Sequence, residues 1–346
     1  MAIGSLRFTI FAKKLFMNRK ILTFPLIYAI ITTFASCSEK NFENSGAVWG
    51  TSYRIVYSAY DDLGDSIIAV MKQVEDELSM FEPSSTVSRV NRSEDPTVGK
   101  MFADVFQISK EISEASGGAF DPTIGPLTNL WGFGYKHVDD SIVPSQAAID
   151  SALITVGMAD CRIADGKVIK KHPQTVFDFS SVAKGYGVDA VAAMLRRNGS
   201  SNYLVEIGGE ISAKGVNPKG QTWRIQIDAP VSGDYGHQRM YVMCLDDAAV
   251  ATSGNYRNYR ETAGGRIGHT IDPHSGLPVA TATASATVIA PDCATADALA
   301  TACMVIDAQK AIALIESTEG VEALLAVAQN DTIVTLRTSN FPDTLN

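Results

Sequence analysis

The sequence lacks the short motifs that mark the commonest metal and nucleotide sites. Its five cysteines include no CxxC pair, and none stands at a ligand-like spacing from one of the five histidines, which excludes the usual zinc sites. Neither the P-loop pattern GxxxxGK followed by Ser or Thr nor the dinucleotide pattern GxGxxG occurs, so a P-loop or Rossmann site has no support. Internal repeats and low-complexity segments are also absent from the sequence.

Positive charge is scarce as well. The 346 residues carry a formal net charge of −9, and the first 36 contain five basic residues and no acid, so the remainder carries −9 − 5 = −14. An acidic chain of this kind repels phosphate backbones, and nucleic acid is therefore not an expected partner. The hydrophobic content of 46% is that of an ordinary globular protein with a sizeable core.

The N-terminus has the layout of a secretory signal. An apolar run of 16 residues, 21–36, follows Arg19 and Lys20 and is short for a transmembrane helix. Two small residues before Cys37 resemble a bacterial lipobox, in which the cut falls before the cysteine and its new N-terminus is acylated. The alternative is a single membrane anchor that is never cleaved. In both cases the globular part would lie outside the cytoplasm. We expect the first, an exported bacterial lipoprotein that is membrane-anchored and faces the periplasm.

The domain organisation follows from this reading. We predict a lipoprotein-type signal peptide at residues 1–36, a polar tether at 37–47 and one domain at 48–340. In an oxidising compartment Cys293 and Cys303 either pair or remain buried thiols, and their spacing leaves both possibilities open.

Hydrophobic periodicity predicts strands and helices that do not alternate strictly, which favours an α+β fold. Residues 120–127 are rich in Gly and Pro and are predicted to form a loop, and the apolar positions of the helix that starts near Gly64 run on to Phe81. The other predicted helices carry Val105 to Ala115, 182–197, 295–306 and 308–317, and the predicted strands are 49–57, 175–179, 203–207, 223–228, 241–245, 248–252, 283–290, 323–327 and 332–336.

Two segments have the chemistry of a site for a metal-bound phosphate. In ADALATA, residues 296–302, Asp297 and Thr301 stand four residues apart on a predicted helix, so two hard oxygen ligands face the same way and suit Mg²⁺. A helix cap is the alternative role for Asp297. In DFSSVAKGYG, residues 178–187, small residues lead into a helix start, which favours phosphate binding, and Lys184 adds a point charge.

A histidine and a polar turn supply candidates for proton transfer. His269 would act on an attacking hydroxyl as a general base or an electrostatic helper. Asp272, which precedes a proline, either orients this histidine or begins a turn, and the sequence does not decide between the two. The segment TSG at 252–254 follows a predicted strand and offers Ser253 and backbone N–H donors.

These motifs occur in the order seen in the ApbE family of FAD:protein FMN transferases, which the chain resembles from about Val48 to Leu336. The resemblance implies a single domain related to the T-fold, with mixed antiparallel sheets and packed helices. It rests on residues 178–187, on TSG at 252–254 and on the segments that contain His269 and Asp297. It rests also on WGT at 49–51, GAFDP at 118–122, IGPL at 124–127 and VEIGGE at 205–210.

The resemblance also implies an activity and a set of residues. FAD would be split at its pyrophosphate with Mg²⁺ present, AMP would leave, and FMN would be joined to a threonine hydroxyl of an acceptor protein. The backbone carbonyl of Ala183, Asp297 and Thr301 would hold Mg²⁺, while His269, with Asp272, would be catalytic. The flavin contacts would fall on Trp49, Phe81, Ala119, Phe120, Asp121, Ser180, Tyr186 and Ile271, with Lys184 near the phosphates.

The expected acceptor is a membrane redox subunit, such as one from a sodium-pumping quinone reductase or an Rnf-type complex, or an exported flavoprotein. Two other functions are compatible with the same residues. One is an Mg²⁺-dependent FAD pyrophosphatase, in which water replaces the threonine. The other is a flavin-binding lipoprotein without turnover.

Overall fold

The computed structural model describes residues 39–136, 143–230, 238–255, 259–262, 265–330 and 332–345. The chain divides into residues 1–40 and 41–346, and only Glu39 and Lys40 of the first part are described. The predicted signal peptide and Cys37 lie outside the described residues. Within the described ranges, no helix has the length and apolar character needed to cross a membrane.

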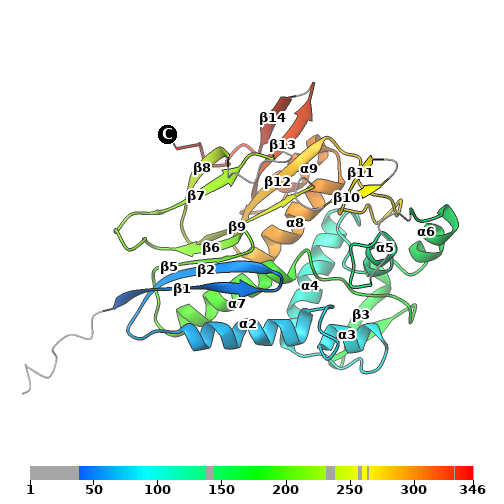
Figure 1. The fold of residues 1–346 in the computed structure, drawn as a ribbon, viewed down its shortest axis with the longest axis horizontal. Coiled ribbons are helices and arrows are strands. Elements are labelled where there is room, and N and C mark those ends of the chain that lie inside the picture. Colours follow the sequence, from blue (N-terminus) through cyan, green and yellow to red (C-terminus); the bar gives the residue numbers. More distant parts are fainter. Residues whose placement is uncertain are drawn as a thin grey trace, which may run out of the picture. The chain divides into compact units, whose positions relative to one another are not determined.

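An eight-stranded sheet runs through residues 41–346 (Figure 1). From its second strand onward the neighbours pair antiparallel, for example with Tyr53 opposite Ile207 and Thr287 opposite Thr252. In spatial order the strands are β1 (Lys40–Val48), β2 (Thr51–Ala59), β5 (Tyr203–Ile207), β6 (Glu210–Lys214), β9 (Ala248–Gly254), β12 (Thr283–Ala290), β13 (Glu322–Gln329) and β14 (Thr332–Arg337).

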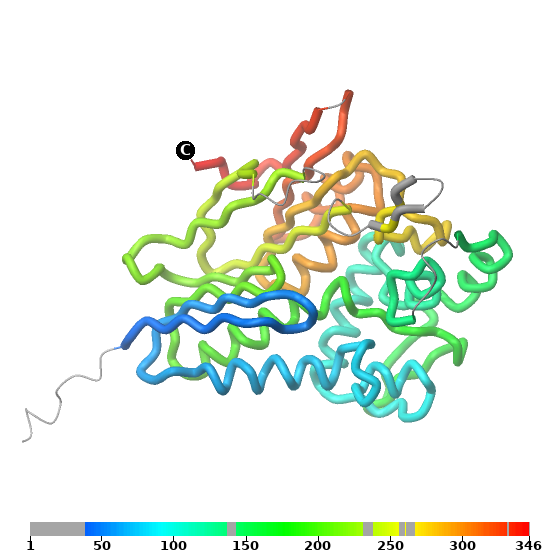
Figure 2. Tube along the Cα trace, in the orientation of Figure 1, coloured from blue at the N-terminus to red at the C-terminus, as the bar shows by residue number. Residues whose placement is uncertain are grey.

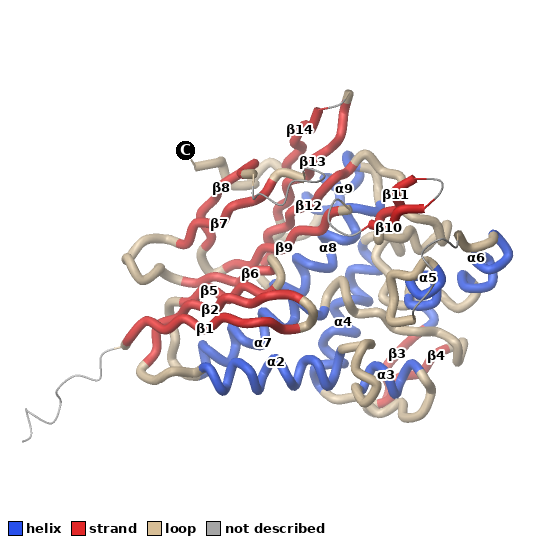
Figure 3. Tube along the Cα trace, viewed as in Figure 1, coloured by secondary structure: helices blue, strands red, loops and turns tan. Residues whose placement is uncertain are grey.

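Helices α7 (Ala183–Arg197), α8 (Cys293–Val305) and α9 (Ala308–Glu316) pack on one face of this sheet (Figure 3). Helix α2 (Gly64–Leu78) packs against α7, and α4 (Lys100–Ala115) packs against α8. The other helices of the described residues are α3 (Thr86–Asn91), α5 (Gly125–Leu130) and α6 (Gln146–Leu153), with a 3₁₀ turn at Met158–Asp160. Three further strand pairs occur in the part of the chain that the structure describes: β3 (Cys161–Ala164) with β4 (Lys167–Lys170), β7 (Trp223–Asp228) with β8 (Arg239–Leu245), and β10 (Tyr259–Thr262) with β11 (Gly265–Gly268).

Both faces of the sheet are covered, as strand β2 illustrates. Tyr53, Ile55 and Tyr57 pack in one cluster with residues of helices α2 and α7. Val56 points the other way and joins a second cluster with Trp223 of strand β7. Because side chains alternate along a strand, a sheet that is buried on both sides needs apolar residues at consecutive positions, and β2 supplies them.

The α+β prediction is confirmed, and several elements coincide with their predicted ranges. Strands β5, β7 and β12 occupy the predicted residues, and helix α7 begins one residue later than predicted. Helix α8 begins at Cys293 rather than at residue 295.

The prediction of a tether before Val48 is wrong for residues 40–47. They belong to β1, an edge strand with mostly exposed side chains, and Phe42 stacks on Tyr57 with ring centroids 5.6 Å apart. Hydropathy misses such a strand because the pairing of its backbone with β2, rather than burial of its side chains, holds it in place.

Three further local predictions differ from the structure. Residues 175–179 form only one bridge, between Val176 and Ile124, because Phe177 and Phe179 turn into an aromatic cluster with Phe102. The predicted loop 120–127 ends in the first turn of α5. Phe81, predicted to continue the buried stripe of α2, lies beyond the helix end and is 62% exposed.

Candidate functional site

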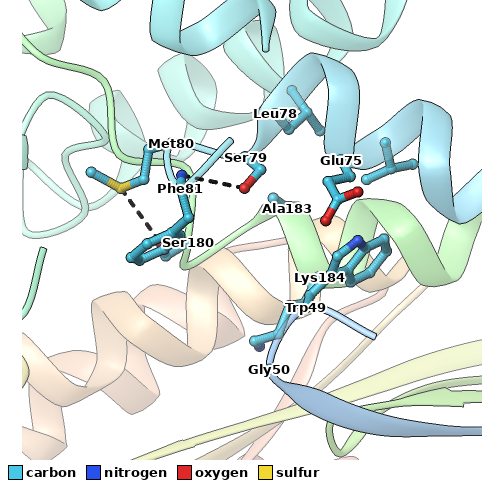
Figure 4. Close-up of a pocket in the computed structure, with 11 residues that line it drawn as sticks. Trp49, Gly50, Glu75, Leu78, Ser79, Met80, Phe81, Ser180, Ala183 and Lys184 are labelled. Atoms are coloured by element: carbon cyan, nitrogen blue, oxygen red, sulfur yellow. Dashed lines mark hydrogen bonds between the residues drawn. The ribbon is translucent and has the colours of Figure 1, made fainter. Parts of the chain in front are cut away.

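A pocket of about 600 Å³ lies beside the first turn of helix α7 (Figure 4). Pockets of this volume accommodate cofactor-sized ligands. Its walls come from the β1–β2 turn, from the end of α2 with the loop after it, and from residues 180–184. The lining residues are Trp49, Gly50, Val74, Glu75, Leu78, Ser79, Met80, Phe81, Ser180, Ala183 and Lys184.

Trp49 forms one wall, and its backbone is unusual. Trp49 and Gly50 have φ values of 49° and 75°, which a two-residue hairpin turn of the type I′ class requires and which a bulky residue rarely adopts. A Cβ on Gly187 would lie 2.3 Å from Cη2 of Trp49. The indole therefore occupies the space that the missing side chain of Gly187 leaves on helix α7.

Lys184 marks the polar end of the pocket. Its Nζ lies 2.5 Å from Oε1 of Glu210 and 3.8 Å from Oδ2 of Asp297, and both carboxylates are almost fully buried. Burial opposes the charged form of Lys184, but the two carboxylates outweigh it and hold the pKa of Lys184 above its ordinary value. Burial also raises the pKa of Glu210 to about 7 and that of Asp297 above its usual range, against the effect of Lys184.

Helices α7 and α8 meet closely beside this cluster, where Figure 2 shows them as the green and orange tubes. A Cβ on Gly185 would lie 2.3 Å from the carbonyl oxygen of Cys293. The N–H of Gly185 donates to Oδ2 of Asp297 over 3.1 Å. This contact brings Asp297 to the helical turn that begins at Ala183, so two of the three predicted metal ligands share one junction.

The third predicted metal ligand, Thr301, lies one helical turn beyond Asp297 on α8. Its hydroxyl is 3.2 Å from that of Ser253 at the end of β9. Two residues later, Oδ1 of Asn255 accepts a hydrogen bond of 2.7 Å from Thr270, the neighbour of His269. The predicted TSG segment, together with Asn255 directly after it, thus connects the helix that carries Asp297 with the segment that carries the histidine.

The side chain of Asp272 makes its hydrogen bonds within the turn that it begins, to His274 and Ser275. Its Oδ1 accepts a 3.0 Å hydrogen bond from the N–H of His274 and lies 3.2 Å from Nδ1 of that residue, while Ser275 donates to Oδ2 over 2.8 Å. Of the two roles that the sequence left open for Asp272, the structure supports the turn. The imidazole that this carboxylate orients is that of His274.

The remaining predicted flavin contacts lie outside the lining of the pocket. Ala119 and Phe120 are buried, and Asp121 accepts hydrogen bonds from Thr123 and from the N–H of Met158. The hydroxyl of Tyr186 donates to Asp104 over 3.0 Å. Ile271 is buried in a separate cluster with Leu127, Trp131 and Ile149. Of the predicted flavin set, the structure brings together Trp49, Phe81, Ser180 and Lys184.

Two residues of this region were missed as site candidates. Glu210 follows the glycine pair of VEIGGE and reads in sequence as a strand residue, although an acid beside two glycines is a signal that could have been followed. Phe133 forms an edge-to-face contact with His269, with ring centroids 6.4 Å apart. Because 136 residues separate the two rings in the chain, no local pattern links them. Within the described part of the chain, no group of three or more His, Cys, Asp or Glu side chains is arranged to hold a metal ion.

Comparisons with known proteins agree with the sequence resemblance. The ApbE family model matches residues 49–325. An FAD:protein FMN transferase from Vibrio cholerae is 36% identical over 306 residues, which cover 86% of this chain and 90% of that protein. One from Haemophilus influenzae is 33% identical over 340 residues, which cover 93% and 97%.

Solved structures give the same picture. The flavin transferase ApbE from Vibrio cholerae superposes with a TM-score of 0.80 at 34% identity, covering 88% of this chain and 99% of that one. The apo form of the Pseudomonas stutzeri flavinyl transferase ApbE superposes with a TM-score of 0.77 at 34% identity, covering 87% and 95%.

Proposed function

The chain belongs to the ApbE family, and from this premise we propose that it transfers FMN from FAD to an acceptor protein and releases AMP. The observation that carries the proposal is the position of Lys184. It lines a pocket of cofactor size and is held there by two buried carboxylates. A flavin dinucleotide combines a flat apolar ring with an anionic pyrophosphate, and the pocket offers apolar walls and, at one end, the ammonium group of Lys184 beside two carboxylates that would hold a cation.

The residues at the junction of α7 and α8 fit Mg²⁺. A carboxylate, a hydroxyl and a backbone carbonyl are hard oxygen donors, and Asp297, Thr301 and Ala183 would supply them. The buried cluster of Lys184, Glu210 and Asp297 carries one excess negative charge when all three groups are ionised, which favours a cation. When bound, Mg²⁺ would neutralise charge that develops on the pyrophosphate.

Side chains of this chain would then bind the two parts of FAD and activate the acceptor hydroxyl. Lys184 holds the pyrophosphate by its charge, and Trp49 with Phe81 covers the flavin ring. His269 takes the proton from a threonine hydroxyl of the acceptor. The threonine oxygen bonds to the flavin-side phosphorus, the bond from that phosphorus to the bridging oxygen breaks, and AMP leaves with this oxygen. Positioning supplies much of the rate in phosphoryl transfer.

The test is AMP release from FAD with Mg²⁺ by the protein starting at Ser38, with and without a threonine-bearing acceptor domain. We expect AMP mainly with the acceptor, and the acceptor should gain the mass of FMN on a threonine. Equal AMP without any acceptor would identify a pyrophosphatase. Tight FAD binding with no AMP in either reaction would identify a binding protein and contradict both enzymatic functions.

We further propose that the mature protein is a lipoprotein that faces the periplasm and modifies an exported or membrane-bound redox protein. Residues 1–37 support this by their signal-like layout. Labelled palmitate should be incorporated into the wild-type protein and sediment with membranes, while Cys37→Ser should abolish the label. A wild-type protein that remains unlabelled and soluble would contradict the proposal.

A further inference from the structure

The aromatic ring of Phe133 lies close to two polar side chains that come from a different part of the chain. The ring of His269 meets it edge to face, with centroids 6.4 Å apart and an interplanar angle of 71°. The guanidinium carbon of Arg260 lies 6.0 Å from the same ring centroid. Edge-to-face contacts constrain the orientation of both rings, so Phe133 limits the rotation of the imidazole.

The turn that carries Phe133 is tightly held. Its N–H donates to the carbonyl of Thr128 over 2.8 Å, and the N–H of Gly134 donates to the same oxygen over 3.0 Å. Trp131 is anchored on both sides, because its indole N–H donates to the carbonyl of Gly276 over 2.8 Å and its own carbonyl accepts from Arg260. These hydrogen bonds therefore fix the backbone that carries the ring of Phe133.

Thr128 also links this turn to the loop before helix α7. Its hydroxyl lies 3.0 Å from Oδ2 of Asp178 and 3.2 Å from the carbonyl of Gly125 in its own helix. The other oxygen of Asp178 accepts a 3.0 Å hydrogen bond from the N–H of Ser180, which lines the pocket. One residue thus connects the pocket loop with the turn that contacts the histidine.

We propose that Phe133 and Thr128 are positioning residues: Phe133 orients the imidazole of His269, and Thr128 fixes the turn of Phe133 to the loop that lines the nucleotide pocket. The inference rests on the proposed function, in which His269 takes the proton of the acceptor hydroxyl. A displacement of about 1 Å in such a group can lower a rate about 100-fold.

Phe133→Leu tests the first half, because leucine keeps apolar bulk and removes the ring. We expect the rate of FMN transfer at saturating FAD to fall at least about tenfold, while the FAD dissociation constant, measured by quenching of flavin fluorescence, stays within about twofold. Phe133→Tyr should restore most of the rate. Leu153→Ala is the matched control, since Leu153 is an aliphatic residue that packs, like Phe133, against the cluster with Trp131.

A direct readout of the contact is the proton spectrum of the histidine rings, with the resonance of His269 assigned by its loss in His269→Ala. The phenyl ring should displace this resonance, and Phe133→Leu should abolish the displacement while Phe133→Tyr keeps it. An unchanged resonance in Phe133→Leu, an unchanged transfer rate, or a parallel loss of FAD binding would each overturn the role of Phe133.

Thr128→Val tests the second half, because valine has nearly the same shape and lacks the hydroxyl. The transfer rate should fall with FAD binding retained, and Thr128→Ser should recover it. Thr155→Val is the control, since the Thr155 hydroxyl donates to a carbonyl of its own turn, that of Ala152. A rate equal to that of the control would overturn the link through Asp178.

A double-mutant cycle separates this inference from the proposed function. In a His269→Ala background, Phe133→Leu should lower the transfer rate no further, because the group that it positions is gone. An additional loss would overturn the positioning role and leave the proposed function intact. A His269→Ala protein with the wild-type rate would instead overturn the role of the histidine in the proposed function, and with it the catalytic purpose of Phe133.

Discussion

At the residue scale, the buried charges around Lys184 define the polar end of the pocket. Three ionisable groups in contact with each other are expensive to bury unless they are paired, and here one cation faces two carboxylates. One oxygen of Glu210, Oε2, is buried without a hydrogen-bond partner. The excess of one carboxylate over the single cation would be unfavourable in a purely structural core. It is compatible with a site that receives a second cation.

Asp297→Ala should abolish Mg²⁺-dependent turnover. The change removes the only carboxylate of the proposed metal ligand set, so the increase in melting temperature on addition of Mg²⁺ should be lost as well. Calorimetry with and without Mg²⁺ measures this independently of activity. Asp343→Ala, at an exposed ion pair with Arg337, is the control. Near-normal activity of Asp297→Ala would refute the assignment of the metal site.

Gly187→Ala should weaken FAD binding by about tenfold, because the new methyl group displaces the indole of Trp49 from the pocket wall. Alanine is the better helix former by about 1 kcal/mol, so the fold itself should tolerate the change.

Gly185→Ala, two residues earlier in the same helix, should instead lower the stability of the fold. Its methyl group meets the backbone carbonyl of Cys293, which cannot rotate away, and should destabilise the protein by about 1–3 kcal/mol.

Fluorescence titration with FAD and urea denaturation distinguish the two glycine variants. If Gly187→Ala bound FAD like the wild type, Trp49 would not be a wall of the flavin site.

At the element scale, the start of helix α8 determines where Asp297 lies. Asp189 on α7 accepts hydrogen bonds of 2.9 Å from the N–H groups of Cys293 and Ala294, while Asp292 caps the N–H of Thr295. Free N–H groups at a helix N-terminus need such acceptors. A side chain of α7 thus caps the N-terminus of α8. This explains why α8 begins before the position that its own sequence predicts.

Asp189→Ala should lower the free energy of unfolding by about 1–2 kcal/mol, the usual cost of losing a cap. Asp189→Asn keeps one acceptor oxygen and should cost less. Because the N-terminus of α8 moves with its cap, the Mg²⁺ affinity should also fall in Asp189→Ala. Urea midpoints and Mg²⁺ titrations of the two variants provide the measurement. Equal midpoints for the wild type and Asp189→Ala would show that the capping bonds contribute nothing to stability.

At the scale of the whole molecule, the four cysteines after Cys37 are free thiols, and only Cys244 is exposed. Cys293 and Cys303 lie on the same helix ten residues apart. At 1.5 Å per residue their Cα atoms are about 15 Å apart, too far for a disulfide. The structure therefore answers the question that their spacing left open.

Burial raises the pKa of Cys161 to about 11 and that of Cys303 to about 12, because the charged thiolate is disfavoured there. At pH 8 almost none of either thiol is ionised, so in the protein starting at Ser38 iodoacetamide should label Cys244 alone in the native state and all four cysteines in denaturant. Reaction of the buried thiols should increase as the pH is raised toward these values. Mass spectrometry counts the labels. Labelling of Cys161 at the rate of Cys244 would contradict the buried environment.

Local sequence signals were enough to determine several elements. The apolar spacing in helix α7 and the alternation in strands β5, β7 and β12 depend on neighbours within a few residues, so these elements were predicted close to their bounds. The same spacing identified α2 and α4 as helices, but it did not give the end of α2 at Leu78 or the start of α4 at Lys100. The pairing of Asp297 with Thr301 on one helix face is local in the same sense, and the order of the motifs along the chain pointed to the family.

Contacts between residues far apart in the chain were settled by the tertiary structure alone. Strand β1 exists because β2 offers it a backbone partner, Lys184 meets Glu210 across 26 residues, and the ring of Phe133 meets His269 across 136. In the same way Asp272 was assigned to His274 rather than to His269. Helical and strand periodicity is fixed by local backbone geometry, so it can be read from a short stretch of sequence. The contacts just named depend on how the helices and the sheet pack against each other, which brings residues distant in the chain together.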